Sequence, residues 1–279
     1  MKKTACICLF ALMIIFYSLS VSADEKEKEN KDKPWERFSF NLGGFITSLN
    51  SDISLGAKGL NLEVNVEDAL DMDSSVSVFR VDGLWRFSRN LRHRLDLGWF
   101  DISRDGHTTL LQDIEIGDTI FPLGTVVTSS FNLQVFKGAY SYSFFQDDRM
   151  DLGVSFGLFV MPIDFKIDAS GGFEGHEKES ITAPLPVLGL RADFAITPKL
   201  FLKYNLDFFY LEIDKFEGAV TDNKLVLEYN AFKNIGFGIG LERFSIYIKA
   251  EDEDYPNIDF KGSFQFSYFG LMAYCKVYF

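Results

Sequence analysis

Apolar and polar residues alternate with a period of two from residue 37 to the end of the chain. Such alternation is typical of β-strands that bury one face. Ten segments carry the pattern, so we expect an all-β chain with ten strands, although eight or twelve are also compatible with it. The expected strands span residues 37–48, 76–88, 92–104, 126–145, 149–168, 182–196, 199–214, 222–233, 235–250 and 262–279.

The connections between these segments alternate between short and long along the chain. Transmembrane β-barrels have short periplasmic turns and longer extracellular loops. The spacing therefore predicts an antiparallel up-and-down transmembrane β-barrel, and its even strand number places both termini in the periplasm. The long connections are 49–75, 105–125, 169–181, 215–221 and 251–261, and the short ones lie at 88–91, 146–148, 197–198 and 234.

One face of most segments changes from apolar to polar toward the expected extracellular end. In 152–168, for example, Leu158 and Val160 are followed on the same face by Asp164 and Lys166. An apolar stretch of about nine to eleven residues is what a tilted strand needs to cross a bilayer. The pattern therefore predicts a barrel that protrudes above the membrane on the extracellular side.

The opposite face, which points into the barrel, carries charges of both signs in the membrane layer. Buried charges persist only when they are paired. We therefore expect an ion-paired plug across the lower lumen. The plug residues are Arg80, Asp82, Arg86, Arg94, Asp96, Lys137, Asp151, Arg191, Asp193, Lys203, Asp207, Glu242 and Lys276.

Above these charges the inward residues are apolar and form an expected upper chamber. Small barrels are narrow enough for side chains to fill them. We favour a packed core, and keep open a cavity that receives a small hydrophobic ligand from outside. The chamber residues are Phe100, Ile102, Phe131, Leu133, Met161, Ile163, Phe165, Phe209, Leu211, Phe244, Ile246, Phe264 and Phe266.

The first 23 residues have the composition of a secretory signal peptide. Lys2 and Lys3 precede an apolar stretch that ends at the small residues Val21-Ser22-Ala23. Cleavage there leaves a charged periplasmic tail, 24–36, before the barrel at 37–279. It also leaves Cys275 as the last cysteine, so we expect no intramolecular disulfide.

Composition narrows the class of protein further. The chain has 279 residues, 30 of them Phe, which is too much apolar surface for a disordered chain. After the N-terminal segment no apolar run reaches the length of about eighteen residues that a membrane helix needs. The formal net charge of −12 argues against a nucleic-acid partner, because phosphate binding requires a basic surface.

Two histidines in predicted extracellular loops are candidates for hydrolytic chemistry. His107 lies near Asp105, and His176 lies between Glu174 and Glu177. A histidine and an acid that converge could activate a nucleophile. Surface loops often collect such residues by chance, so we expect the protein not to be an enzyme.

The remaining motifs favour neither a metal nor a cofactor. Asp71-Met72-Asp73-Ser74 is spaced like the start of a calcium loop, but the sixth position is Val76 where that loop requires glycine. The glycines of 236–240 lie on a strand with no helix after it, so they do not form a phosphate loop. The acidic loops are best explained as a solvated surface, with weak binding of divalent cations shared with lipopolysaccharide as a lesser alternative.

The signal peptide, the amphipathic strands and the C-terminal Val277, Tyr278 and Phe279 resemble those of the small bacterial outer-membrane β-barrels. That superfamily includes OmpA-like membrane domains and OmpW. The resemblance implies a Gram-negative outer membrane, contact with its lipid and lipopolysaccharide, and recognition of the C-terminal aromatic by the outer-membrane assembly machinery. The superfamily is functionally mixed and its best-known members have eight strands, so it implies no site residues.

We therefore expect a non-enzymatic outer-membrane barrel that binds or passes small apolar molecules or has an envelope-structural role. Two alternatives stay open. The protein could be a surface interaction or adhesion protein that uses its long acidic loops, or a lipid or peptide hydrolase with its site at the rim.

Overall fold

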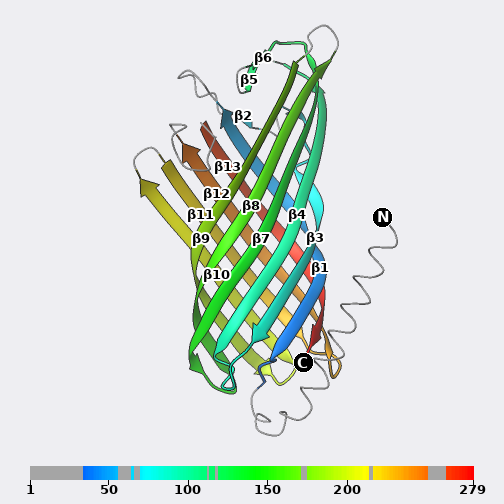
Figure 1. Cartoon of the computed structure of the whole chain (residues 1–279). Helices are drawn as coiled ribbons and strands as arrows, with labels where there is room; N and C mark the ends of the chain where they lie inside the picture. Colours follow the sequence, from blue (N-terminus) through cyan, green and yellow to red (C-terminus); the bar gives the residue numbers. More distant parts are fainter. Residues whose placement is uncertain are drawn as a thin grey trace, which may run out of the picture.

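A computed structural model of the chain describes residues 34–55, 64–65, 70–111, 113–116, 119–170, 175–213, 216–250 and 262–279. Within these residues, ten antiparallel strands pair with their neighbours along the chain, and the last pairs with the first, which closes a barrel (Figure 1). The barrel strands are β1 (Phe38–Leu55), β3 (Ser75–Arg86), β4 (His93–Thr109), β7 (Val126–Gln146), β8 (Met150–Ser170), β9 (Gly175–Thr197), β10 (Leu200–Ile213), β11 (Phe216–Tyr229), β12 (Ile235–Ala250) and β13 (Gly262–Tyr278). The short strand β2 (Val64–Asn65) pairs with β1, and β5 (Ile114–Ile116) pairs with β6 (Thr119–Phe121).

The predicted fold class is confirmed, because the described chain is a closed, antiparallel, ten-stranded barrel. Among the described residues, no helix is long and apolar enough to span a membrane. The expected signal peptide, 1–23, and residues 24–33 of the expected tail lie outside the described residues.

Two of the predicted long connections, 169–181 and 215–221, are wrong. Residues 171–174 alone separate β8 from β9, and residues 214–215 alone separate β10 from β11. These segments are polar on their outward face, which made them resemble loops. In the structure the polar residues lie on strands that continue beyond the apolar part of the wall.

Both ends of the barrel-forming chain meet at one end of the barrel. The amide of Arg37 donates to the carbonyl of Phe279 at 2.8 Å, and the amide of Phe279 donates to the carbonyl of Phe38 at 2.8 Å. The connections 87–92, 147–149, 198–199 and 230–234 lie at this end, which we call the turn end, and the opposite end is the loop end (Figure 1).

The outward face of the barrel is apolar over the half nearer the turn end. On β12, outward residues from Ile235 to Leu241 are exposed and apolar, and the next outward residue is Arg243. A contiguous exposed apolar surface of this kind is typical of a membrane-facing wall. We call it the apolar belt, and its large exposed side chains include Leu42, Ile46, Phe79, Leu97, Phe136, Phe156, Leu158, Leu188, Leu190, Phe208, Leu225, Leu227, Phe237, Ile239, Phe269 and Leu271.

Two of the strand ladders stop part-way up the barrel. Pairing between β3 and β4 ends at Arg80 and Phe100, and pairing between β9 and β10 ends at Phe208 and Leu188. Toward the loop end, β4, β7, β8 and β9 continue as one sheet, while β10 to β13 continue with β1 and β3 as another (Figure 1). We call these two interruptions the β3–β4 seam and the β9–β10 seam.

The β3–β4 seam is filled by residues 70–74. Met72 forms an isolated antiparallel bridge with Gly106 of β4, and the amide of Leu49 donates to the carbonyl of Ser74 at 2.8 Å. Leu70 and Met72 are both buried. A Cβ on Gly106 would lie 2.4 Å from the carbonyl oxygen of Leu70, so this close approach requires glycine.

The β9–β10 seam begins beside two prolines. Pro184 and Pro186 lie on β9 just beyond Leu188, the last residue that pairs with β10. The ladder between β9 and β8 runs unbroken through both prolines. Because proline has no N–H to donate, the edge that lacks donors must face β10. At these two positions β9 therefore offers β10 no hydrogen-bond donor.

Candidate functional site: a filled lumen

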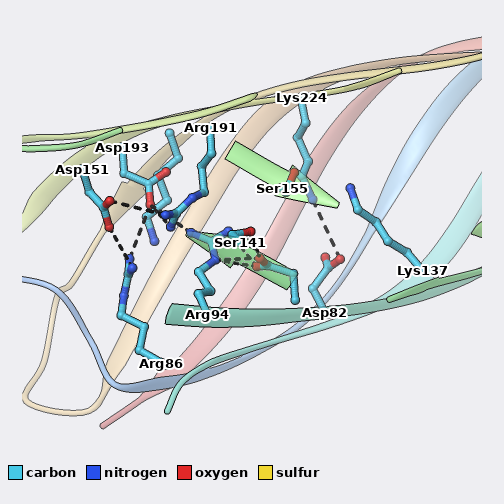
Figure 2. Close-up of polar contacts among 12 residues, drawn as sticks. Asp82, Arg86, Arg94, Lys137, Ser141, Asp151, Ser155, Arg191, Asp193 and Lys224 are labelled. Atoms are coloured by element: carbon cyan, nitrogen blue, oxygen red, sulfur yellow. Dashed lines mark hydrogen bonds and ion pairs between the residues drawn. The ribbon is translucent and has the colours of Figure 1, made fainter. Parts of the chain in front are cut away.

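Ionisable side chains from β3, β4, β8 and β9 meet inside the barrel near the turn end (Figure 2). Arg86 Nη1 lies 2.8 Å from Asp151 Oδ2, and Arg191 Nη2 lies 3.3 Å from Asp151 Oδ1. Arg94 Nη1 lies 3.1 Å from Asp193 Oδ2. All five side chains are buried. Isolated buried charges are strongly unfavourable, so their mutual pairing is what allows them to stay ionised.

A second group of ion pairs lies further toward the loop end. Arg80 Nε donates to Asp82 Oδ2 at 2.8 Å, and Arg80 Nη1 donates to Glu242 Oε2. Lys137 Nζ donates to Asp207 Oδ2. Two further contacts complete the group, Lys137 Nζ to Asp222 Oδ2 at 3.4 Å and Lys224 Nζ to Asp82 Oδ1 at 3.8 Å.

A third group contains an acid from the residues that precede β1. Lys203 Nζ and Lys276 Nζ donate to Glu36 Oε1 at 2.8 Å and 3.0 Å. Lys203 Nζ also lies 3.0 Å from Glu228 Oε1. Burial acts to raise the pKa of Glu36, but the two ammonium groups outweigh it and hold that pKa well below its usual range. Glu36 therefore stays ionised and holds the residues just before β1 against the inside of the barrel.

Trp35 closes the turn end beside Glu36. Its side chain is buried against Leu91 and Phe201, and its indole Nε1 donates to the carbonyl of Asp147 at 2.7 Å. The last two residues of the expected charged tail, 24–36, thus belong to the barrel interior. These contacts explain why the two residues lie inside. The indole of Trp35 needs a hydrogen-bond acceptor once it is buried, and Glu36 pairs with two lysines that the barrel buries.

The structure brings all thirteen predicted plug residues into this network of ion pairs. Sequence reasoning missed four further members, Glu36, Asp222, Lys224 and Glu228. The last three share the inward face of β11 with buried Val226, so the period-two alternation could have found them. Glu36 had no such signal. The network thus joins Arg80, Arg86, Arg94, Lys137, Arg191, Lys203, Lys224 and Lys276 to Glu36, Asp82, Asp96, Asp151, Asp193, Asp207, Asp222, Glu228 and Glu242.

A polar cavity of about 80 Å³ lies among these charges. Its lining includes Asn41, Asp96, Lys203, Asp207 and Tyr274. The volume is enough for a few water molecules, which such a polar lining can bind. The lower lumen is therefore an ion-pair network with room for a few water molecules.

The upper lumen is packed with apolar side chains. Ile102, Leu133, Met161, Ile246 and Phe266 are 0% exposed. Ring contacts run through the cluster; the centroids of Phe131 and Phe266, for example, lie 5.8 Å apart. Leu70, Leu110 and Phe121, from the connections at the loop end, are buried in the same cluster.

Eleven of the thirteen residues predicted for the upper chamber are buried in this cluster. The two exceptions lie on β10. Phe209 is half-buried, and Leu211, expected inside the chamber, is 36% exposed. The reason is the β9–β10 seam: among the described residues β10 does not pair with β9 beyond Phe208, so Leu211 lies beside the seam.

The two candidate histidines each contact a residue on a neighbouring strand. His107 Nδ1 lies 3.0 Å from Thr128 Oγ1, and His176 Nδ1 contacts Asp168 Oδ1. Both pairs lie exposed on the outer wall. Glu174 lies outside the described residues, and the side chain of Glu177 is not described.

The described residues contain no group of three or more His, Cys, Asp or Glu side chains that could hold a metal ion. Asp71 and Asp73 are exposed, whereas the acidic residues 251–254 lie outside the described residues.

Gly238 gives room to the ring of Tyr274, since a Cβ there would lie 2.2 Å from it. The hydroxyl of Tyr274 donates to Glu228 at 2.8 Å, so this glycine helps to place the ion-pair network.

No protein-family model and no curated protein matches this sequence. Solved structures do match it. The outer-membrane protease OmpT from Escherichia coli aligns with 86% of this chain and 97% of its own at 9% identity, with a TM-score of 0.50. Ail, the attachment invasion locus protein of Yersinia pestis, covers 86% of this chain and 99% of its own at 9% identity and a TM-score of 0.37.

The toluene transporter TodX of P. putida covers 87% of this chain and 90% of its own at 7% identity, with a TM-score of 0.37. At such identities a likeness extends to the fold and not to the activity. Taken with the closed ten-stranded barrel and its apolar belt, the similarity to OmpT leads to one conclusion: this chain has the fold of an outer-membrane β-barrel protein.

Proposed function

We propose that this protein is a closed, non-conducting barrel of the bacterial outer membrane with an envelope-structural role. The observation that carries the proposal is a lumen filled in two layers. Ion pairs such as Arg86 with Asp151 occupy the lower lumen, and an apolar cluster around Phe131 and Phe266 occupies the upper lumen. Ion conduction needs a continuous polar path, and the apolar cluster interrupts it.

The orientation in this proposal places the turn end in the periplasm and the loop end outside the cell. Short turns on the periplasmic side are the rule for such barrels. The proposed partners are the lipid and lipopolysaccharide around the apolar belt, and the assembly machinery that would recognise Val277, Tyr278 and Phe279. The protein acts without a cofactor and without catalysis in this proposal.

Conductance in planar lipid bilayers tests the closed state. The purified wild-type barrel is expected to give no discrete current steps. Removing the stacked rings with Phe131→Ala and Phe266→Ala is expected to leave the current at baseline as well, because the ion pairs below remain. Reproducible steps from the wild-type protein would overturn the proposal.

The structural role is tested in cells that lack the protein. Their growth is expected to become more sensitive to detergent and to chelation of divalent cations, and the wild-type chain is expected to restore resistance. Unchanged sensitivity after deletion would contradict an envelope-structural role. Folding of the expressed protein is checked by its heat-dependent mobility on a denaturing gel.

A second candidate function, passage of small apolar molecules, is favoured by the β9–β10 seam. The seam starts at Leu188 and Phe208, which belong to the apolar belt, and leads past half-buried Phe209 and exposed Leu211 to the apolar cluster. Apolar side chains thus border the seam between the outer wall and the interior. A hydrocarbon could follow it without crossing the ion pairs.

Crosslinking the seam tests this second function. In a Cys275→Ser background, Val187→Cys with Phe209→Cys would join β9 to β10 one residue beyond their last pair. Oxidation is expected to reduce accumulation of radiolabelled naphthalene to the level of cells without the protein. Leu190→Cys with Leu206→Cys, at an existing pair of the same ladder, is the matched control.

If the seam crosslink forms and accumulation is unchanged, the lateral route is excluded. Leu211→Trp provides a second variant that narrows the seam without a disulfide. This variant is also expected to reduce the accumulation of naphthalene.

A further inference from the structure

A hollow of about 170 Å³ opens on the outer wall over β10 to β13 (the strands are placed in Figure 1). It lies at the edge of the apolar belt nearer the loop end. Strand register arranges its lining in two rows. The outward side chains are Tyr204, Leu225 and Leu241 in the row nearer the turn end, and Asn223, Arg243 and Phe269 in the next row.

The outward polar side chains at this hollow offer hydrogen-bond donors. Arg243 is exposed, and it has no hydrogen bond or ion pair with any described residue. The hydroxyl of Tyr204 donates to Asn223 Oδ1 at 3.0 Å. The amide nitrogen of Asn223 is therefore directed away from Tyr204, and it has no partner among the described residues.

Among the described residues, the outward side chains around Arg243 supply no negative charge; Glu242 also lines the hollow, but its buried side chain pairs with Arg80 in the lumen. The next outward residues toward the loop end on β11, β12 and β13 are Thr221, Ser245 and Ser267, all uncharged. The chain as a whole is acidic, with a net charge of −12. Arg243, at the edge of the apolar belt, is nevertheless a cation without a counter-ion among the described residues. A ligand that complements the hollow would be anionic at one end and apolar at the other.

We propose that this hollow binds a phosphorylated lipid of the outer leaflet. Its phosphate would contact the guanidinium of Arg243 and the amide of Asn223, and an acyl chain would lie along Leu225 and Leu241. Guanidinium groups bind phosphate through two parallel hydrogen bonds. The belt edge is also where the headgroups of a bilayer meet their acyl chains. The proposal rests on the outer-membrane location proposed above, where such a lipid is the lipid A of lipopolysaccharide.

A simpler account is that Arg243 only extends its charge into the headgroup layer, as basic residues near a membrane boundary commonly do. That account predicts an equal effect of Arg243 on every lipid. The proposed site predicts an effect that depends on the phosphate and on the guanidinium geometry.

Binding of purified lipid A to the detergent-solubilised barrel, measured by native mass spectrometry, tests the site. Arg243→Gln is expected to weaken binding about tenfold, the loss of one charge-assisted contact. Arg243→Lys is expected to restore only part of it. Lys166→Gln removes another exposed cation of the outer wall and is the matched control, with no expected change.

Dephosphorylated lipid A is expected to bind weakly and equally to the wild-type protein and to Arg243→Gln. Inorganic phosphate at millimolar concentration is expected not to compete, because it lacks the acyl chains; competition would show a site for free phosphate and overturn the lipid assignment. Equal binding of lipid A to the wild-type barrel and to folded Arg243→Gln would also overturn the proposal. Bilayer conductance is independent of this site, so a conducting wild-type barrel would refute the closed state and leave the lipid site standing.

Discussion

The two seams interrupt the same barrel but differ in what lies between their strands. Residues 70–74 fill the β3–β4 seam, where Met72 bridges to Gly106. At the β9–β10 seam no described residue pairs with the free edge of β9, and two prolines remove its donors. One seam is therefore closed by a segment of the chain, and the other is kept unpaired by its own sequence.

The largest expected effect compares two leucines that the sequence assigned to the same chamber. Leu133 is 0% exposed and pairs with a strand on each side, whereas Leu211 is 36% exposed beside the β9–β10 seam. Leu133→Ala is expected to lower the free energy of unfolding by about 2–5 kcal/mol, through lost burial and a cavity. Leu211→Ala is expected to lower it by less than about 1 kcal/mol. Urea unfolding in lipid vesicles measures both, and equal losses would show that the seam is closed at Leu211.

A smaller effect is expected from breaking the filled seam. Gly106→Val places a side chain where the carbonyl of Leu70 lies, so we expect a loss of about 1–3 kcal/mol and release of residues 70–74. Limited proteolysis should then cut the chain near Met72. Gly83→Val is the control, because a Cβ at Gly83 meets no atom within 4 Å. Cleavage near Met72 in neither variant would contradict this packing.

The smallest effect is expected from restoring backbone N–H donors to β9 at the β9–β10 seam. Pro184→Thr with Pro186→Thr restores two N–H groups that face β10. New pairing is expected to slow hydrogen exchange of the amides of Tyr210 and Glu212, which continue the register opposite residues 186 and 184. The free energy of unfolding should change by less than about 1 kcal/mol, because the new hydrogen bonds are offset by the lost stiffness of proline. If exchange at Tyr210 and Glu212 does not change, the prolines are not what keeps β10 apart from β9.

Residue alternation predicted much of the fold because a period of two reports directly which face a side chain occupies. It identified ten strands and placed charges such as Arg86 and Asp193 in the lumen. It does not report which edges are hydrogen-bonded, so both seams were invisible and Leu211 was assigned to the interior. The predicted loop 169–181 failed for a related reason: a strand with a polar outward face looks like a loop when only its polarity is read.

The site was harder to predict where a residue lies outside the alternating strands. Glu36 follows a run of lysines and acids, and nothing in that run distinguishes it from its neighbours. Its role depends on Lys203 and Lys276, which are distant in the chain. Only three-dimensional structure brings such partners together.

The position of Glu36 also bears on how the barrel is completed. Glu36 precedes β1, but its partners lie on β10 and β13, and β13 is the strand that closes the ring against β1. This acid can reach both lysines only after the first and last strands have joined. These ion pairs therefore form last, when the barrel closes. In a chain arrested before closure, Glu36 would remain separated from Lys203 and Lys276.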